Sequence, residues 1–214
     1  MKYIMYNEEN SVIHYDEYEE IKDKITYKYM NFGRETIVRK VKFVEDKFKL
    51  SSEDDIQNKP AFSLCMKLDG EFSYYLEKKS RQNEMIYKTF INLTKDDCIK
   101  ILNRDIDWIK NSKKPLVKEF YLYLTINNLE PSTLMEYRRL VFEKPGKHCV
   151  VFNEEIRRAM DKNAGLLDEN IQMFDCLSCD KIVMSYKNLI KIPRALNSIL
   201  HISNEKSVEL AFSI

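Results

Sequence analysis

Glycine is scarce in this sequence, with only four among 214 residues. The loops that cradle nucleotide phosphates with backbone N–H groups need closely spaced glycines, and the chain has neither a GxGxxG segment nor a Walker sequence. A dinucleotide-binding or P-loop domain is therefore excluded. Any phosphate that the chain binds has to be held by side chains.

The sequence also lacks an excess of charge of either sign, because 35 Lys and Arg residues balance 34 Asp and Glu residues. A net charge of +1 gives no support for nucleic-acid or membrane-surface binding, so a site for a polyanion has to be a local cluster. No apolar run approaches the ~20 residues of a bilayer span, and the start of the chain turns acidic where a signal peptide is apolar. We expect a cytoplasmic protein without direct membrane insertion.

Disulfides are not expected either, because the five cysteines are odd in number and widely spread. Cys176 and Cys179 form a CxxC pair, but a structural zinc site needs two further ligands and a thioredoxin-like pair needs a βαβ context. Two ordinary thiols are the favoured interpretation. The chain is 44% hydrophobic, which is enough for a sizeable core, and residues 1–214 are expected to form a single domain.

Hydrophobic alternation and helical spacing predict an α+β fold with a mainly antiparallel sheet. Asp69-Gly70 and Pro145-Gly146 are typical of hairpin turns, and residues 48–60 read as an exposed loop. Closure of the sheet into a barrel does not follow from this pattern. The expected strands cover 36–43, 61–68, 72–80, 86–93, 117–129, 133–143, 148–159 and 181–192, and the expected helices cover 15–29 (with Asp16 as N-cap), 94–111 and 193–202.

Several short blocks, in order, resemble the VTC domain family of polyphosphate-polymerase-like proteins, relatives of the CYTH-like triphosphate tunnel metalloenzymes. The blocks are IVRKVKF (37–43), YLEKKSRQNEMIYKTFINLTKDD (75–97), KNSKKPLVKEFY (110–121), MEYRRLVFEKPGKHCVVFNEEIRRA (135–159) and KIVMSYKNLIKIP (181–193). The resemblance covers about residues 36–206. It implies an antiparallel β-tunnel or barrel with helices packed outside and basic side chains inside.

The resemblance also implies a chemistry, the transfer of the γ-phosphoryl group of ATP to polyphosphate with Mn²⁺ or Mg²⁺. Such a transfer depends on positioning and on neutralising negative charge, which Arg, Lys and a divalent cation supply. ATP and polyphosphate are then the expected partners. Matched to the family, the catalytic candidates are Lys79, Arg139 and Lys187, the phosphate-binding candidates are Arg39, Lys88, Arg157 and Lys206, and the metal-binding candidate is Glu77.

The chain departs from the family at five positions of the expected tunnel wall. Ser63 and Cys65 replace two basic residues, and Ser185 stands where the family has a metal-binding Glu, which puts the metal in doubt. The other two replacements are Cys149, for a basic residue, and Asn153, for an acidic one. Whether the chain is an enzyme therefore stays open. The alternatives are a polymerase, a triphosphatase, and a catalytically impaired tunnel that binds polyphosphate, a nucleotide or a protein.

Strand alternation predicts which of these side chains share a face. Glu77 and Lys79 are expected on one face of their strand, while Arg139 is expected to point with Tyr137 away from Arg138. Arg139 and Lys187 are expected to face each other across the lumen.

Overall fold

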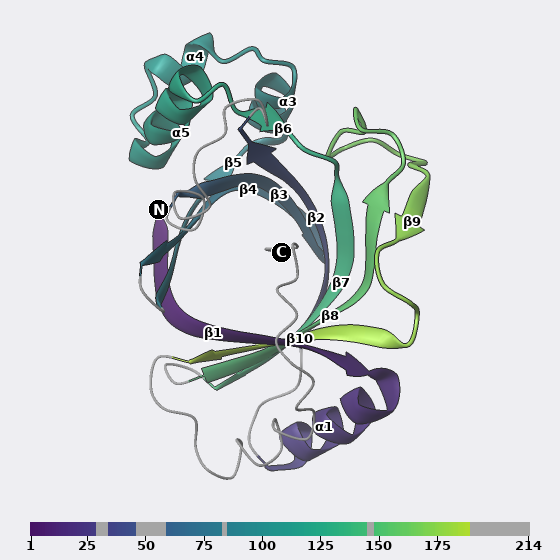
Figure 1. Ribbon diagram of the computed structural model, residues 1–214. Helices are drawn as coiled ribbons and strands as arrows, with labels where there is room; N and C mark the ends of the chain where they lie inside the picture. The colour runs from purple at the N-terminus through teal and green to yellow at the C-terminus, as the bar shows by residue number, and fades with distance from the viewer. Residues whose placement is uncertain (29–33, 46–58, 83–84, 145–147, 189–214) are drawn as a thin grey trace. The chain divides into compact units, whose positions relative to one another are not determined.

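The computed structural model describes residues 1–28, 34–45, 59–82, 85–144 and 148–188 (Figure 1). The chain divides into two compact units. The first unit comprises Met1–Met5, Val38–Glu136 and Arg158–Phe174, and the second comprises Tyr6–Ile37, Tyr137–Arg157 and Asp175–Ile214. The single-domain organisation stays a prediction. The expected helix over 193–202, the Pro145-Gly146 turn, Lys206 and most of the loop over 48–60 lie outside the described residues.

Ten strands and four helices are described. The strands are β1 (Lys2–His14), β2 (Arg34–Val44), β3 (Ala61–Asp69), β4 (Glu71–Gln82), β5 (Met85–Leu93), β6 (Glu130–Pro131), β7 (Met135–Lys144), β8 (His148–Ala159), β9 (Met173–Asp175) and β10 (Lys181–Asn188), and the helices are α1 (Tyr15–Lys28), α3 (Lys95–Leu102), α4 (Asp107–Lys110) and α5 (Pro115–Ile126).

The first unit is built on an antiparallel sheet with the strand order β1–β5–β4–β3–β2, and β6 adds to β2. In the hairpin of β3 and β4, Ser63 lies opposite Glu77 and Asp69 opposite Glu71. Gly70 between them has a φ of 73°, the left-handed conformation that glycine adopts without steric cost. The hairpin expected from Asp69-Gly70 is thus confirmed, and β4 continues into β5 with Lys79 opposite Lys88.

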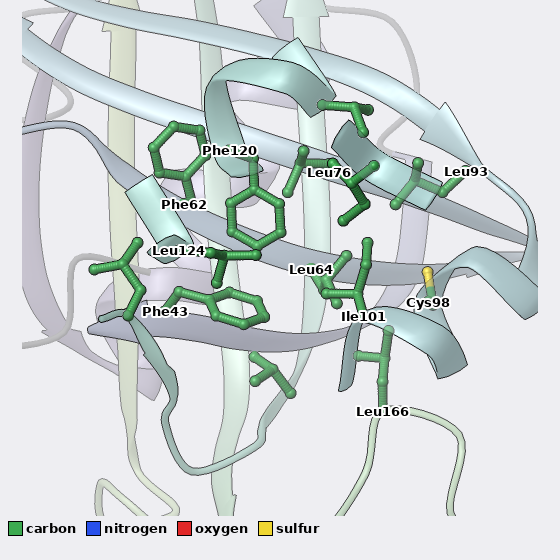
Figure 2. Packing of buried hydrophobic residues seen from close by; sticks show 14 of the residues in the cluster. Phe43, Phe62, Leu64, Leu76, Leu93, Cys98, Ile101, Phe120, Leu124 and Leu166 are labelled. Atoms are coloured by element: carbon green, nitrogen blue, oxygen red, sulfur yellow. The ribbon is translucent and has the colours of Figure 1, made fainter. Parts of the chain in front are cut away.

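One face of this sheet is apolar, and helices α3–α5 cover it (Figure 1). Figure 2 shows how Phe120 of α5 packs between Phe43 and Phe62 of the sheet, with ring centroids 4.9 Å and 5.3 Å away. Thr94 starts α3 as expected, because its side chain accepts a hydrogen bond from the Asp97 N–H while the Asp97 carboxylate accepts one from the Thr94 N–H. Since α3 ends at Leu102, the expected helix over 94–111 is two helices.

Residues 117–129 were expected as a strand, and this prediction is wrong, because α5 spans most of them. The aromatic residues of this segment are typical of strands, and their alternation with other residues over a few positions looks like period two. The buried residues Val117, Phe120 and Leu124 instead follow the three- and four-residue spacing of a helix, and Pro115 occupies the first turn, where proline is tolerated.

The second unit joins β1, β10 and β8 in antiparallel pairs, with β7 beside β8. Helix α1 packs on this sheet through Tyr18, Ile21 and Ile25, the spacing that predicted the helix. Asp16 lies inside the first turn, and the carboxylate of Glu17 accepts the hydrogen bond from the His14 N–H instead. The expectation of Asp16 as N-cap is therefore wrong, because α1 begins one residue before it.

Strands β1, β6 and β9 are elements that the sequence pattern did not predict. In β1, NEEN at 7–10 breaks any apolar alternation. The mainly antiparallel sheet with helices on its outer face is confirmed. In the described part of the chain, no helix combines the length and apolar character of a membrane span.

We expect Phe120→Ala to lower the free energy of unfolding by about 3–5 kcal/mol, because it leaves a cavity between the rings of Phe43 and Phe62. Leu122→Ala is the matched control on the same helix, since Leu122 is 53% exposed, and it should change stability by less than about 0.5 kcal/mol. Urea unfolding of both variants measures the difference. Equal losses would contradict the packing of α5 described above.

Candidate functional site

The face of the first unit's sheet that points away from the helices carries a cluster of lysines. Because side chains alternate along a strand, Val41 and Phe43 point into the apolar core while their neighbours Lys40 and Lys42 point to the other face. The register places Lys79 of β4 directly opposite Lys88 of β5 on that same face. We name it the lysine face; its cations are Lys40, Lys42, Lys79 and Lys88.

Glu77 lies within the lysine face and is held by two lysines. Its Oε1 is 3.0 Å from the Nζ of Lys40, and its Oε2 is 3.3 Å from the Nζ of Lys88. All three residues are less than 10% exposed. A carboxylate and an ammonium group lose much of their hydration at such a position, so each depends on its partners for stabilisation.

Lys42 shows how closely the positive charges are placed. Burial lowers the pKa of Lys42, and the charges of Lys40 and then Lys79 lower it further. Strands β2 and β4 thus bring three ammonium groups within electrostatic reach of one another. Positive charge gathered in this way on a half-buried face favours the binding of an anion with several negative charges.

Two neutral residues of β3 share the lysine face at places where the resemblance led us to expect cations. Ser63 lies opposite Glu77, and Cys65 lies opposite Tyr75. Burial raises the pKa of the Cys65 thiol to about 12, and the negative charge of Glu77 adds to this effect. Cys65 is therefore a neutral thiol at physiological pH and contributes no charge.

Arg39 is placed on the opposite face of β2 from Lys40. Its Nε is 2.7 Å from the Oε2 of Glu136, and its Nη1 donates a hydrogen bond of 2.7 Å to the backbone carbonyl of Asp168. The strand alternation that points Val41 into the core also points Arg39 to that side. Arg39 does not share a face with the lysines.

The second unit has a polar face of its own, on the side of its sheet that points away from α1. The Nε of Arg139 donates a hydrogen bond of 2.8 Å to the Oδ1 of Asn153, and the guanidinium lies 5.0 Å from the Tyr137 ring. Lys187 pairs with Glu8 at 3.2 Å. Burial raises the pKa of the Cys149 thiol, whereas the charges of Lys187 and Arg139 lower it, so both cations lie near this thiol.

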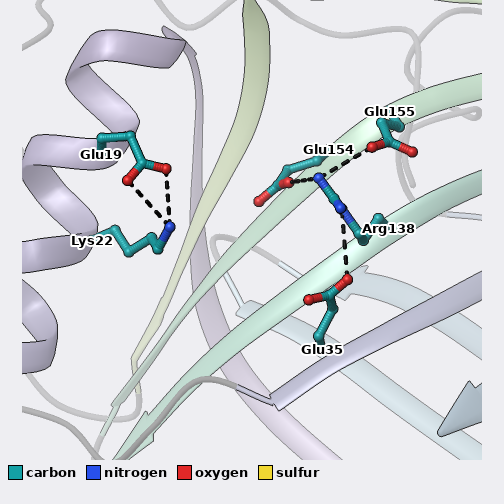
Figure 3. A network of polar contacts seen from close by, with 6 residues as sticks. All are labelled: Glu19, Lys22, Glu35, Arg138, Glu154 and Glu155. Atoms are coloured by element: carbon teal, nitrogen blue, oxygen red, sulfur yellow. Dashed lines mark hydrogen bonds and ion pairs between the residues drawn. The ribbon is translucent and has the colours of Figure 1, made fainter.

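Arg138 points to the opposite face, as strand alternation predicts. It lies 2.7 Å from Glu154, 3.1 Å from Glu155 and 3.7 Å from Glu35 (Figure 3). Glu155 has a φ of 50°, a left-handed conformation that interrupts the alternation of β8 and lets two consecutive carboxylates reach one guanidinium. Arg138 is thus bound in an ion-pair network beside α1.

The remaining candidates are less informative. Arg157 is half-buried near the end of β8. Lys206 lies outside the described residues.

The donor atoms do not fit a divalent cation. Mg²⁺ and Mn²⁺ prefer several anionic oxygen ligands, but both oxygens of Glu77 face ammonium groups. Ser185, where the resemblance led us to expect a metal-binding Glu, donates a hydrogen bond of 2.6 Å to the Oδ1 of Asn10. Over the described ranges, no three His, Cys, Asp or Glu residues come together as a metal site, and the CxxC pair is no exception.

Lys40 and Lys42 were missed as candidates, although the sequence contains a signal for them. In the strand VRKVKF, Val41 and Phe43 lie two residues apart and therefore point together into the core. Lys40 and Lys42 alternate with them and therefore point together to the other face. The family resemblance drew attention to Arg39 instead.

Comparison with known proteins identifies a family over nearly the whole chain. The family model of the VTC domain matches residues 5–213. No curated protein matches the chain.

Solved structures show the same fold at low sequence identity. A putative adenylate cyclase from Bacillus halodurans is 10% identical with a TM-score of 0.57, and the match covers 94% of this chain and 88% of that one. A putative adenylyl cyclase from Hippeastrum, described as having a dominant triphosphatase activity, is 7% identical with a TM-score of 0.52 and coverages of 92% and 84%.

A third match is of a different kind. A chain of the Schizosaccharomyces pombe Mediator head module is 10% identical with a TM-score of 0.52, and the match covers 92% of this chain and 89% of that one.

We expect Cys65 to resist alkylation in the folded protein, because burial and Glu77 keep its thiol protonated. At pH 8, iodoacetamide should modify the exposed Cys179 well before Cys65, and denaturation should abolish the difference. Peptide mass spectrometry over a time course measures both sites. Early modification of Cys65 would contradict its placement on the lysine face.

Proposed function

Because the chain belongs to the VTC domain family, we propose that its lysine face binds linked phosphates, either the triphosphate group of ATP or inorganic polyphosphate. The observation that carries this proposal is the gathering of Lys40, Lys42 and Lys79 on one half-buried sheet face. We also propose that the protein acts in the cytoplasm, as its sequence indicates.

Linked phosphates suit this face better than a small anion does. Neighbouring strands are about 4.8 Å apart, so ammonium groups on β2, β4 and β5 form an extended row. A chain of phosphates carries charge along its length and can contact several of these groups at once. Burial and then repulsion from Lys40 and Lys79 lower the pKa of Lys42, and each charge-assisted hydrogen bond to a phosphate relieves that repulsion.

The fold comparison supports the same ligand class. The Hippeastrum protein of this fold is described as having triphosphatase activity, which requires it to bind a triphosphate. The second unit contributes Arg139 and Lys187 on its own polar face, and a role for them in phosphate binding is part of this proposal.

Phosphoryl transfer is less well supported than binding. Transfer from ATP needs neutralisation of charge on the migrating phosphoryl group, which kinases and polymerases achieve with divalent cations. The donor atoms around Glu77 and Ser185 do not fit such an ion. We therefore propose a binding module, and keep the ATP-dependent polymerase as the second candidate because Glu77, Lys79 and Lys88 all occur at the positions of the family's motif.

Incubation with ATP and Mn²⁺ separates the two candidates. Polyphosphate staining of a gel detects polymer, and a coupled assay detects ADP. For a binding module we expect neither product from folded protein. Polymer formation that Lys79→Ala abolishes would instead establish the polymerase, and phosphate release without polymer would establish a triphosphatase.

Lys79 and Lys78 provide a matched test of the lysine face, because they are neighbours on β4 that point to opposite sides. Lys78 pairs with Glu119 on α5, whereas Lys79 lies opposite Lys88. We expect Lys79→Ala to weaken binding of tripolyphosphate by about 1.5–3 kcal/mol, the range for a hydrogen bond to a charged group. Lys78→Ala should leave binding unchanged, as calorimetry can show. Equal losses of affinity in the two variants would show that the ligand does not bind on the lysine face.

The second unit allows the same comparison. Arg139→Ala is expected to weaken binding by about 1.5–3 kcal/mol, and Arg138→Ala to leave it nearly unchanged because Arg138 is bound by carboxylates beside α1. If Arg138→Ala weakened tripolyphosphate binding as much as Arg139→Ala does, the polar face of the second unit would not be the binding surface. Melting temperatures of all variants control for loss of folding.

A further inference from the structure

Glu77 is the acid at the family's metal-binding position on β4, yet its surroundings are those of a counter-ion. Each of its carboxylate oxygens faces a different ammonium group, Lys40 at 3.0 Å and Lys88 at 3.3 Å. The two lysines come from strands on opposite sides of the hairpin of β3 and β4. This arrangement closes a three-residue bridge across the sheet, with Glu77 in the middle.

A divalent cation bound to Glu77 would have to replace these lysines. Two ammonium groups would then lie buried a few ångströms from a doubly charged ion, and like charges at that distance repel strongly where water is excluded. The lysines would also lose the carboxylate with which they pair, and loss of one member of a buried ion pair is costly. The bridge is therefore incompatible with a metal at this position.

An anion meets the opposite situation. A polyphosphate approaching the lysine face can take over the hydrogen bonds that Lys40 and Lys88 make to Glu77, so both ammonium groups keep an anionic partner. The Glu77 carboxylate, which is 8% exposed, gives up two partners in this exchange, and that loss opposes binding. The carboxylate and the ligand thus compete for the same two donors.

We propose that Glu77 is a resident counter-ion which linked phosphates displace from Lys40 and Lys88, so that binding needs no divalent cation and Glu77 opposes it. This inference rests on the proposed function of the lysine face. It assigns Glu77 a role opposite in sign to that of a metal ligand, because a metal ligand promotes phosphate binding and a competing anion weakens it.

The direct test is Glu77→Gln, which keeps the shape of the side chain and removes its charge. Calorimetry with tripolyphosphate in EDTA-treated buffer should show binding to the wild-type protein, and the substitution should tighten it by roughly five- to tenfold. Glu119→Gln is the matched control, because Glu119 pairs with Lys78 on the helix side of the same sheet. It should change the affinity by less than about twofold.

Titration of the wild-type protein with Mn²⁺ alone gives a second readout that does not depend on how well the variant folds. We expect no saturable binding in the low millimolar range. Addition of Mg²⁺ at constant ionic strength should weaken tripolyphosphate binding, because the cation occupies the phosphate oxygens that the lysines contact.

The outcomes separate the inference from the proposed function. Saturable Mn²⁺ binding that Glu77→Gln abolishes, or tripolyphosphate binding that requires Mg²⁺, would overturn the inference and leave phosphate binding intact. Weaker tripolyphosphate binding by a folded Glu77→Gln protein would overturn it equally. Absence of binding with and without metal would overturn the proposed function and the inference together.

Discussion

Strand alternation in β2–β5 is the constraint on which the rest of the first unit depends. The antiparallel register of the hairpin directs Leu64 and Leu76 toward the helices, and by the same geometry it directs Glu77 and Lys79 away from them. A shift of one residue would bury the lysines in the apolar core. Packing of α3 and α5 on one face therefore fixes the positions of the charges on the other.

The site chemistry of this chain differs from what its resemblance to the family led us to expect. Ser63 and Cys65 stand on β3 where cations were expected, and Ser185 stands on β10 where a carboxylate was expected and bonds to Asn10. Each of these side chains is neutral and small. The Lys40–Glu77–Lys88 bridge holds one carboxylate of the lysine face between two ammonium groups.

The sequence predicted most strands because apolar alternation and turn residues are local signals. Gly70 marked the hairpin of β3 and β4, and Thr94 marked the start of α3. The prediction failed for α5, where tertiary packing determines the secondary structure. Its sequence is typical of a strand, and only the contact of Phe120 with the sheet shows why it is a helix. For the site, strand alternation correctly placed Arg139 and Arg138 on opposite faces. Matching to the family motif favoured Arg39 over Lys40, because the ion pair that marks Lys40 is made with Glu77, 37 residues away in the sequence.

The lowered pKa of Lys42 also has an evolutionary consequence. Burial and the neighbouring charges of Lys40 and Lys79 disfavour the ammonium form of Lys42, and an apolar side chain of similar length would relieve that repulsion. Random drift under selection for stability alone would remove such a lysine, because proteins stay only just above the stability they need. Persistence of Lys42 among close homologues would thus record selection for a ligand, whereas persistence of the buried Phe120 would record selection for folding.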